Sequence, residues 1–174
     1  MQATRRTGSL IPLRLLGTAA AVVALDQLTK SAAVAALADG PIEVIPGVLT
    51  LRLHSNTGGA FGILQGYPGF FLVATAVVMI TILLWARRVD DRRLLIPLGL
   101  VLGGGGGNLA DRLFRGDHRS VVDFVDLHVW PLFNVADAAI VAGVALIFLL
   151  SVRPPRAGTP HRADDPPEPS SNGP

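Results

Sequence analysis

Four apolar runs of 18 to 28 residues alternate with polar segments along this 174-residue chain. They cover residues 10–37, 69–86, 94–113 and 133–152. At about 1.5 Å per residue, about 20 helical residues cross a hydrocarbon core of about 30 Å. The pattern therefore predicts an all-α membrane protein with four transmembrane helices.

The first apolar run has a second interpretation, a removable signal peptide. Arginines precede the run, and Ala-Leu-Ala at residues 36–38 has the form of a cleavage site. That site lies 13 residues beyond the most apolar stretch, and Asp26 and Lys30 stand between the two. We therefore favour a retained helix.

Residues 38–68 between the first two runs carry a strand pattern. Leu49, Leu51 and Leu53 alternate with polar residues, which is the period of a half-buried strand. Turn-forming residues follow, and residues 60–64 form a candidate second strand. We expect a small β-sheet in this first outer loop, with an irregular loop as the alternative.

Basic residues are concentrated in alternate polar segments. Ten of the fifteen lie on one predicted side of the membrane: Arg5, Arg6, Arg14, Arg87, Arg88, Arg92, Arg93, Arg153, Arg156 and Arg162. The positive-inside rule then predicts that both termini are cytoplasmic. Residues 38–68 and 114–132 would face outward.

Composition narrows the class of protein. Half of the residues are hydrophobic, 16% are charged, the net charge is +2 and cysteine is absent. These values exclude a large soluble enzyme, disulfides and thiolate chemistry, and they do not suggest nucleic-acid binding.

Three segments are predicted along the chain. Residues 1–9 form a cytoplasmic N-terminal segment, residues 10–152 the membrane domain, and residues 153–174 a tail. The tail holds seven of the thirteen prolines among polar residues, which predicts a disordered cytoplasmic segment.

Charged residues inside the predicted helices need partners, because each costs about 2.5 to 3.5 kcal/mol to insert. Asp26 and Lys30 stand four residues apart and can neutralise each other on one helix face. Asp111 has Arg112 beside it and Arg115 four residues later, so local pairing is expected there as well.

The third run contains five consecutive glycines, residues 103–107. Gly99, Gly103 and Gly107 share one helix face at four-residue spacing, which favours close helix packing; a bend in the helix is the alternative. Asn108, which follows the run, is expected to hydrogen bond to another element.

Asp137 has no basic neighbour on its own predicted helix and needs a partner from elsewhere. Asn134, three residues earlier, can donate a hydrogen bond to it. Asp123 lies in an apolar stretch of the second outer loop. If Asp123 and Asp137 meet, they could share a proton and activate a water for peptide hydrolysis; a proton relay, an ion pathway and simple ion pairing remain alternatives.

Other chemistries find little support in the sequence. The histidines lack metal-ligand spacing, so no metal site and no cofactor are expected. The serines lack a nucleophile-elbow motif, and no GxxxxGK[ST] loop follows the glycines.

Taken in order, the motifs resemble those of signal peptidase II, the bacterial lipoprotein signal peptidase family. The resemblance covers about residues 12–150. The motifs that carry it are Asp26-Gln27-Leu28-Thr29-Lys30, Asn56-Thr57-Gly58-Gly59-Ala60-Phe61, Gly103 through Gly107-Asn108-Leu109-Ala110-Asp111-Arg112, Val122-Asp123-Phe124 and Phe133-Asn134-Val135-Ala136-Asp137.

The resemblance implies a membrane-embedded aspartic endopeptidase that cuts diacylglyceryl-modified prolipoproteins before the lipidated cysteine. It implies that Asp123 and Asp137 are the catalytic pair. The supporting residues would be Asp26, Lys30, Asn56, Gly58, Asn108, Asp111, Arg112 and Asn134. A bacterial inner-membrane protein is implied, with lipids and prolipoproteins as partners, no nucleic acid and a monomeric state.

Two departures from the family pattern stand out. The third motif has glycine where the family usually has larger apolar residues, which puts the rigidity of that helix in question. Only nine residues separate Asp123 from Phe133, which shortens the segment over the site.

A small proton-coupled transporter is the alternative function. It would use Asp26, Asp111 and Asp137 as a relay, and such a relay should cross the membrane. The sequence places all three toward the predicted outer half, which favours the peptidase.

Overall fold

The part of the chain that the structure describes contains four α-helices, one short 3-10 turn and three strands. The structure, a computed structural model, describes residues 11–58, 68–115 and 120–152. The elements in chain order are α1 (Leu13–Ala36), β1 (Ile42–Ile45), β2 (Leu49–Asn56), α2 (Pro68–Ala86), the short 3-10 turn η2 (Arg92–Leu94), α3 (Leu95–Phe114), β3 (Val121–Asp126) and α4 (Val135–Val152). The predicted segments 1–9 and 153–174 lie outside the described residues.

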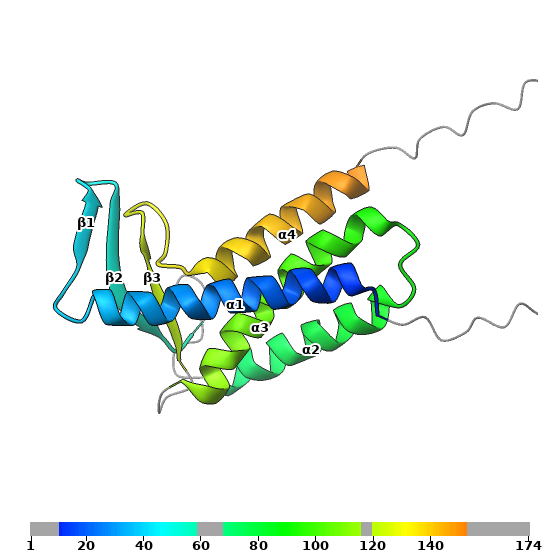
Figure 1. The fold of residues 1–174 in the computed structure, drawn as a ribbon, viewed down its shortest axis with the longest axis horizontal. Coiled ribbons are helices and arrows are strands. Elements are labelled where there is room, and N and C mark those ends of the chain that lie inside the picture. Colours follow the sequence, from blue (N-terminus) through cyan, green and yellow to red (C-terminus); the bar gives the residue numbers. More distant parts are fainter. Residues whose placement is uncertain (1–10, 59–67, 116–119, 153–174) are drawn as a thin grey trace, which may run out of the picture.

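The four predicted membrane helices are confirmed. Each is long and apolar enough to cross a membrane. Their ends differ from the predicted ones by at most three residues; α4 starts at Val135, two residues later than predicted, because Asn134 caps it. In Figure 1 the start of α1 and the end of α4 lie at the same end of the bundle, opposite the sheet.

The glycine run lies in an unbroken helix, α3, which packs against all three other helices. A Cβ on Gly103 would lie 2.7 Å from the carbonyl oxygen of Ala19, and one on Gly99 would lie 2.8 Å from that of Leu15. Gly104 approaches the carbonyl oxygen of Ala136 in the same way. The predicted close packing is therefore confirmed on two sides of α3, toward α1 and toward α4, and the glycines do not open the helix.

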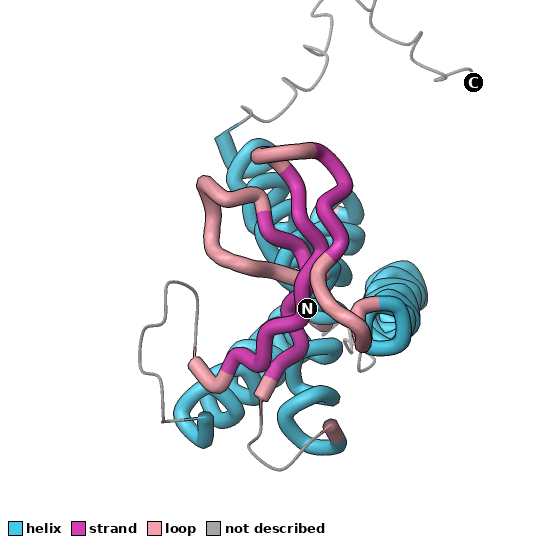
Figure 2. The backbone as a smooth tube through the Cα atoms, turned by 90° about the vertical axis from the view of Figure 1, so that its left-hand side faces the viewer, coloured by secondary structure: helices cyan, strands magenta, loops and turns pink. Residues whose placement is uncertain are grey.

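The sheet is antiparallel, with strand order β1-β2-β3, and it crosses one end of the bundle (Figures 1 and 2). β2 contains the predicted alternating strand. Its partner β3 comes from the second outer loop, so the sheet is not built from the first loop alone. The candidate strand at residues 60–64 lies outside the described part of the chain.

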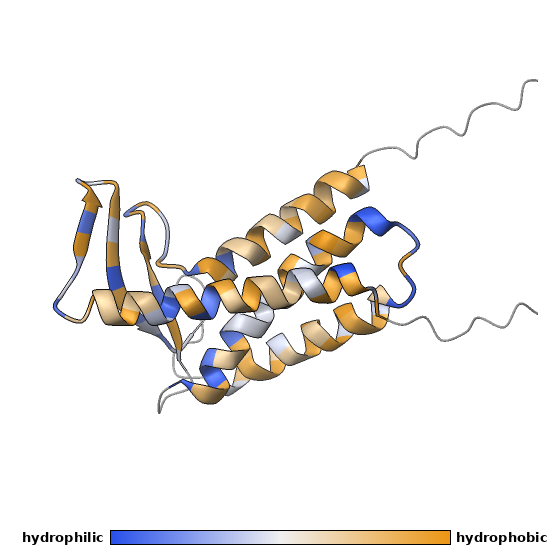
Figure 3. Ribbon diagram, in the orientation of Figure 1, coloured by the Kyte–Doolittle hydropathy of each residue, from blue (hydrophilic) through white to orange (hydrophobic). Residues whose placement is uncertain are grey.

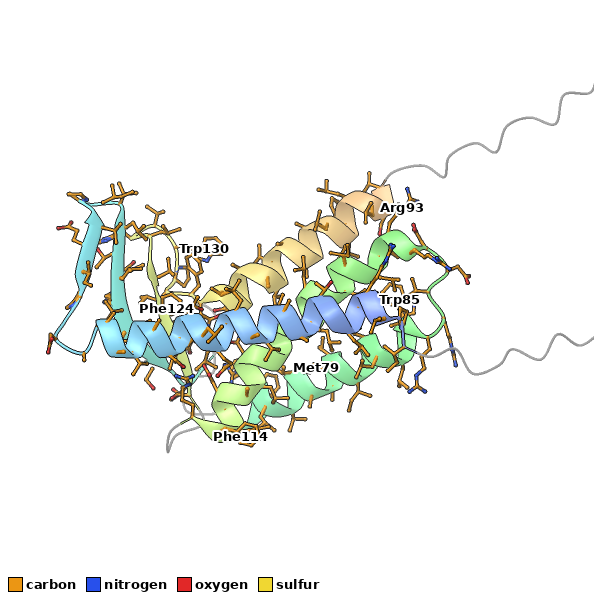
Figure 4. All side chains as sticks on the ribbon, in the orientation of Figure 1. Met79, Trp85, Arg93, Phe114, Phe124 and Trp130 are labelled. Atoms are coloured by element: carbon orange, nitrogen blue, oxygen red, sulfur yellow. The ribbon has the colours of Figure 1, made fainter. Side chains whose placement is uncertain are left out.

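Two apolar clusters hold the parts together. One, around Leu15, Leu98 and Leu102, joins the helices. The other joins the end of α1 to the sheet through Leu37 and Phe124, and Figure 4 shows Phe124 at this junction. The outer faces of the helices are largely apolar in Figure 3, as lipid contact requires. The second cluster presses β3 against α1 and so fixes the strand that carries Asp123.

Candidate active site

Asp137 is held at the start of α4 by a reciprocal pair of hydrogen bonds with Asn134. The backbone N–H of Asp137 donates to Asn134 Oδ1 at 2.9 Å, and the backbone N–H of Asn134 donates to Asp137 Oδ2 at 3.2 Å. This is a capping box, which satisfies two free N–H groups at a helix start. The carboxylate of Asp137 therefore lies at the positive end of the helix dipole.

Asp123 lies in β3 and is almost fully buried, with 1% of its surface exposed. Its Oδ1 accepts from Asn134 Nδ2 at 2.7 Å, and its Oδ2 accepts from Asn56 Nδ2 at 2.9 Å. Asn134 does donate to Asp137, as expected, but through its backbone N–H; its side-chain amide donates to Asp123 instead.

Asp137 receives its side-chain donor from α3. Asn108 Nδ2 donates to Asp137 Oδ1 at 2.8 Å. This confirms that Asn108 bonds across to another element and that Asp137 takes its partner from outside its own helix.

The two aspartates line one cavity of about 240 Å³, together with Asn56, Gly58, Asn108, Arg112 and several apolar residues. The pKa of Asp123 is raised to about 7, mainly by burial and also by the nearby charge of Asp137; hydrogen bonds from Asn56 and Asn134 and the charge of Lys30 oppose the rise. Two like charges at short range in a partly dry site cannot both ionise easily. The pair is therefore suited to holding a single proton.

Arg112 contributes positive charge and positions the first outer loop. Its Nη2 donates to the carbonyl oxygen of Gly58 at 3.2 Å, and its guanidinium lies 5.6 Å from the ring centre of Phe71. The N–H of Gly58 in turn donates to Asn56 Oδ1 at 2.9 Å. Arg112 therefore fixes the turn that presents Asn56 to Asp123. Of the two arginines expected to pair with Asp111, only Arg115 does so, at 3.2 Å.

Lys30 lies at the centre of a buried polar cluster behind the cavity. Its Nζ is 2.8 Å from Asp26 Oδ2, 2.9 Å from Asp111 Oδ2 and 3.1 Å from Asn108 Oδ1. The predicted pairing of Asp26 with Lys30 is confirmed. The contact between Lys30 and Asp111 was not predicted, because the two residues come from helices far apart in the sequence.

Gln27 and Arg115 also belong to this cluster, although the sequence indicated only that Gln27 is part of a motif and that Arg115 can pair with Asp111. Gln27 Nε2 donates to Asp111 Oδ1 at 2.9 Å, and Arg115 Nη2 donates to Gln27 Oε1 at 3.1 Å. The signal was available: Gln27 is a polar residue in an apolar helix, directly beside Asp26. All ten site residues expected from the sequence gather at the sheet end of the bundle, which does not fit a relay across the membrane.

Paired buried carboxylates over a cavity, at the end of four membrane-crossing helices, define the class of membrane-embedded aspartic peptidases. The sequence model described as signal peptidase (SPase) II matches residues 18–153. The chain belongs to this family.

Similar proteins agree with this assignment. The lipoprotein signal peptidase of Shouchella clausii (strain KSM-K16) is 47% identical over 135 residues, which cover 75% of this chain and 87% of the relative. That of Mycobacterium avium (strain 104) is 41% identical over 142 residues, covering 79% and 78%.

Solved structures agree as well. A bacterial membrane enzyme solved by the in meso method at 2.3 Å superposes with a TM-score of 0.70 at 31% identity, covering 79% of this chain and 86% of that one. A second, solved at 1.9 Å, gives a TM-score of 0.69 at 28% identity, covering 85% and 99%. The expected family, fold and activity are therefore confirmed: the chain is a multi-pass bacterial membrane protein with the activity of a lipoprotein signal peptidase, and its substrates are prolipoproteins.

Proposed function

We propose that Asp123 and Asp137 are the catalytic pair and that they cleave diacylglyceryl-modified prolipoproteins just before the modified cysteine. The observation that carries this proposal is that both carboxylates line one cavity and share Asn134 as a hydrogen-bond partner.

In the proposed reaction the pair holds one proton, with Asp123 as its carrier, since the pKa of Asp123 is raised to about 7. Asp137 takes a proton from a water between the two carboxylates while the water oxygen attacks the scissile carbonyl carbon. The proton on Asp123 passes to the carbonyl oxygen, giving a neutral tetrahedral diol. Collapse of the diol breaks the C–N bond, the proton on Asp137 passes to the leaving amine, and a diol proton returns to Asp123.

The environment of the pair supports this division of roles. Asp137 sits at the N-terminus of α4, where negative charge is favoured. Arg112 lines the same cavity. Its positive charge can stabilise the negative charge that develops on the carbonyl oxygen during attack.

A second, apolar cavity supports a lipid-modified substrate. It measures about 380 Å³, runs along the start of α4, and is lined by Leu127, Trp130, Phe133, Asp137, Ala138, Val141, Ala142 and Ala145. Trp130, Phe133, Asp137 and Val141 also line the polar cavity, so the two cavities are adjacent. Figure 4 shows Trp130 beside the start of α4. An acyl chain in this groove would bring the bond before the modified cysteine to Asp137.

We further propose that both termini are cytoplasmic, that the site faces the extracytoplasmic side, and that the enzyme acts as a monomer. The polar segment between α2 and α3, which carries four arginines, lies at the end of the bundle opposite the sheet (Figure 3). Asp123, Asp137 and the side chains that hydrogen bond to them all belong to one chain, so the proposed pair can form without a residue from a second copy.

The test is cleavage of a purified diacylglyceryl-modified prolipoprotein, followed by gel shift. Asp123→Asn and Asp137→Asn are each expected to abolish cleavage while the protein still inserts. Asp126→Asn is the matched control: Asp126 lies on the same strand, is bound to Arg52 at 2.7 Å, and lines neither cavity. It should retain most of the activity.

Residual cleavage by either variant of the pair would rule out the two-aspartate mechanism. Full activity on the unmodified precursor would rule out the requirement for the lipid.

A further inference from the structure

The polar cluster behind the cavity binds the backbone next to each aspartate of the proposed catalytic pair. The N–H of Ala136, the residue before Asp137, donates to Asp26 Oδ1 at 2.9 Å. The N–H of Val122, the residue before Asp123, donates to Asp111 Oδ2 at 3.1 Å. Each catalytic aspartate is therefore anchored, through its preceding residue, to one carboxylate of the cluster.

These two anchoring carboxylates are joined by two side chains of α1. Lys30 contacts both, at 2.8 Å and 2.9 Å. Gln27 joins them a second time: its Nε2 lies 2.9 Å from Asp111 Oδ1 and 3.3 Å from Asp26 Oδ2. The positions of the anchors, and hence the separation of the catalytic carboxylates, depend on both α1 side chains.

Gln27 is itself fixed in place. Its Nε2 also donates to the carbonyl oxygen of Gly107 at 3.1 Å, and its Oε1 accepts from Arg115 Nη2 at 3.1 Å. Arg115 therefore orients the amide with its NH2 group toward the two carboxylates. Gly107 leaves room for this arrangement, since a Cβ there would lie 2.5 Å from Asp26 Oδ2.

We propose that Gln27 is a positioning residue of the peptidase: by bridging Asp26 and Asp111, it sets the separation of Asp123 and Asp137. Gln27 does not line the cavity and acts only through the cluster. The inference rests on the proposed function, because it takes these two aspartates to be the catalytic pair.

Gln27 is a better probe of the cluster than its charged members. Removing one partner of a buried ion pair leaves an uncompensated charge and strongly destabilises a protein. Gln27→Met keeps the length of the side chain and changes no charge, but it removes both donors. Ser31→Ala is the matched control, because it removes only an exposed partner of Arg115, at 3.2 Å.

We expect Gln27→Met to lower kcat by about 10- to 100-fold with little change in KM, since small misplacements of reacting groups have effects of this size. The alkaline limb of the kcat–pH profile should also move to lower pH. The nearby charge of Asp137 raises the pKa of Asp123, so a wider separation lets Asp123 lose its proton earlier as pH rises.

Gln27→Met changes none of the charged groups around Asp123. A shift of the alkaline limb in this variant would therefore report a change in the separation of the two carboxylates. The charged groups are Lys30 of α1, Arg112 of α3 and Asp137 of α4. On β2, His54 pairs in register with Asp123 and is exposed.

The experiment measures kcat, KM and the pH profile of the full-length wild type, Gln27→Met and Ser31→Ala in one detergent. An unchanged kcat, or a lower kcat with an unmoved alkaline limb, would overturn the inference, because a smaller folded fraction lowers activity equally at every pH. If Gln27→Met fails to insert, Gln27→Asn keeps an uncharged amide but shortens the side chain, so it weakens the bridge between Asp26 and Asp111 and should move the limb in the same direction by less.

The two proposals fail differently. Cleavage by Asp123→Asn would overturn the catalytic pair, and the inference about Gln27 with it. An inactive Asp123→Asn, together with a wild-type pH profile in Gln27→Met, would overturn the inference alone.

Discussion

At the scale of single residues, the protonation of Asp123 depends on opposing influences. Burial and the charge of Asp137 raise its pKa to about 7, while hydrogen bonds from Asn56 and Asn134 and the charge of Lys30 lower it. An asparagine amide stabilises the ionised carboxylate without neutralising it. Each amide around the pair therefore adjusts the pH range in which one proton is shared.

The pH dependence of cleavage follows from this balance. Activity that needs the proton on Asp123 is present below a pH of about 7 and is lost as pH rises through that value. Asn56→Ala removes a hydrogen bond that lowers the pKa of Asp123, so the alkaline limb should move to higher pH. Rates measured from pH 5 to 9 would check this, and a limb that stays in place or moves to lower pH would contradict it.

Residues also show what the sequence could predict. The pairing of Asp26 with Lys30 was predictable because the two lie four residues apart on one helix. The contact between Lys30 and Asp111 was not, since it depends on how α1 and α3 pack. Asn134 was recognised as a partner of Asp137, but its side-chain bond to Asp123 appears only once β3 lies beside the start of α4.

At the scale of elements, the four helices were predictable from apolar length, whereas β3 was not. In β3, acidic residues at positions 123 and 126 interrupt the apolar pattern, and four of its six residues are buried. They are buried because β3 lies between β2 and the end of α1. A strand that is buried on both faces does not alternate between apolar and polar residues, so β3 has no local pattern by which it could be recognised.

The glycine run of α3 predicts a sharp difference between neighbouring substitutions. A Cβ on Gly104 would clash with the carbonyl oxygen of Ala136, whereas one on Gly105 would make an ordinary 3.5 Å contact with Met79. Gly104→Ala should therefore destabilise the protein by about 1 to 3 kcal/mol and lower kcat, because Ala136 precedes Asp137. Gly105→Ala should leave both nearly unchanged.

Thermal unfolding in detergent, with cleavage measured in parallel, checks this pair of variants. Equal melting temperatures for the two would mean that α3 and α4 are not closely packed at Gly104.

At the scale of the whole molecule, the absence of cysteine makes the proposed orientation directly testable. Val48 lies in the exposed turn between β1 and β2, and Asp90 lies in the exposed segment between α2 and α3. In intact spheroplasts, a membrane-impermeant maleimide should label Val48→Cys and leave Asp90→Cys unlabelled. Both should react after solubilisation, and labelling of Asp90→Cys alone in spheroplasts would reverse the proposed topology.

The ion pairs of the cluster also bear on how the molecule is assembled in the membrane. Asp26 and Lys30 pair within α1, and Asp111 and Arg115 pair within α3, each four residues apart. Each helix therefore carries its own counter-ion and can enter the lipid with these charges already balanced. The contact between Lys30 and Asp111 forms only when α1 and α3 meet, so neither of these two helices has to wait for the other before it inserts.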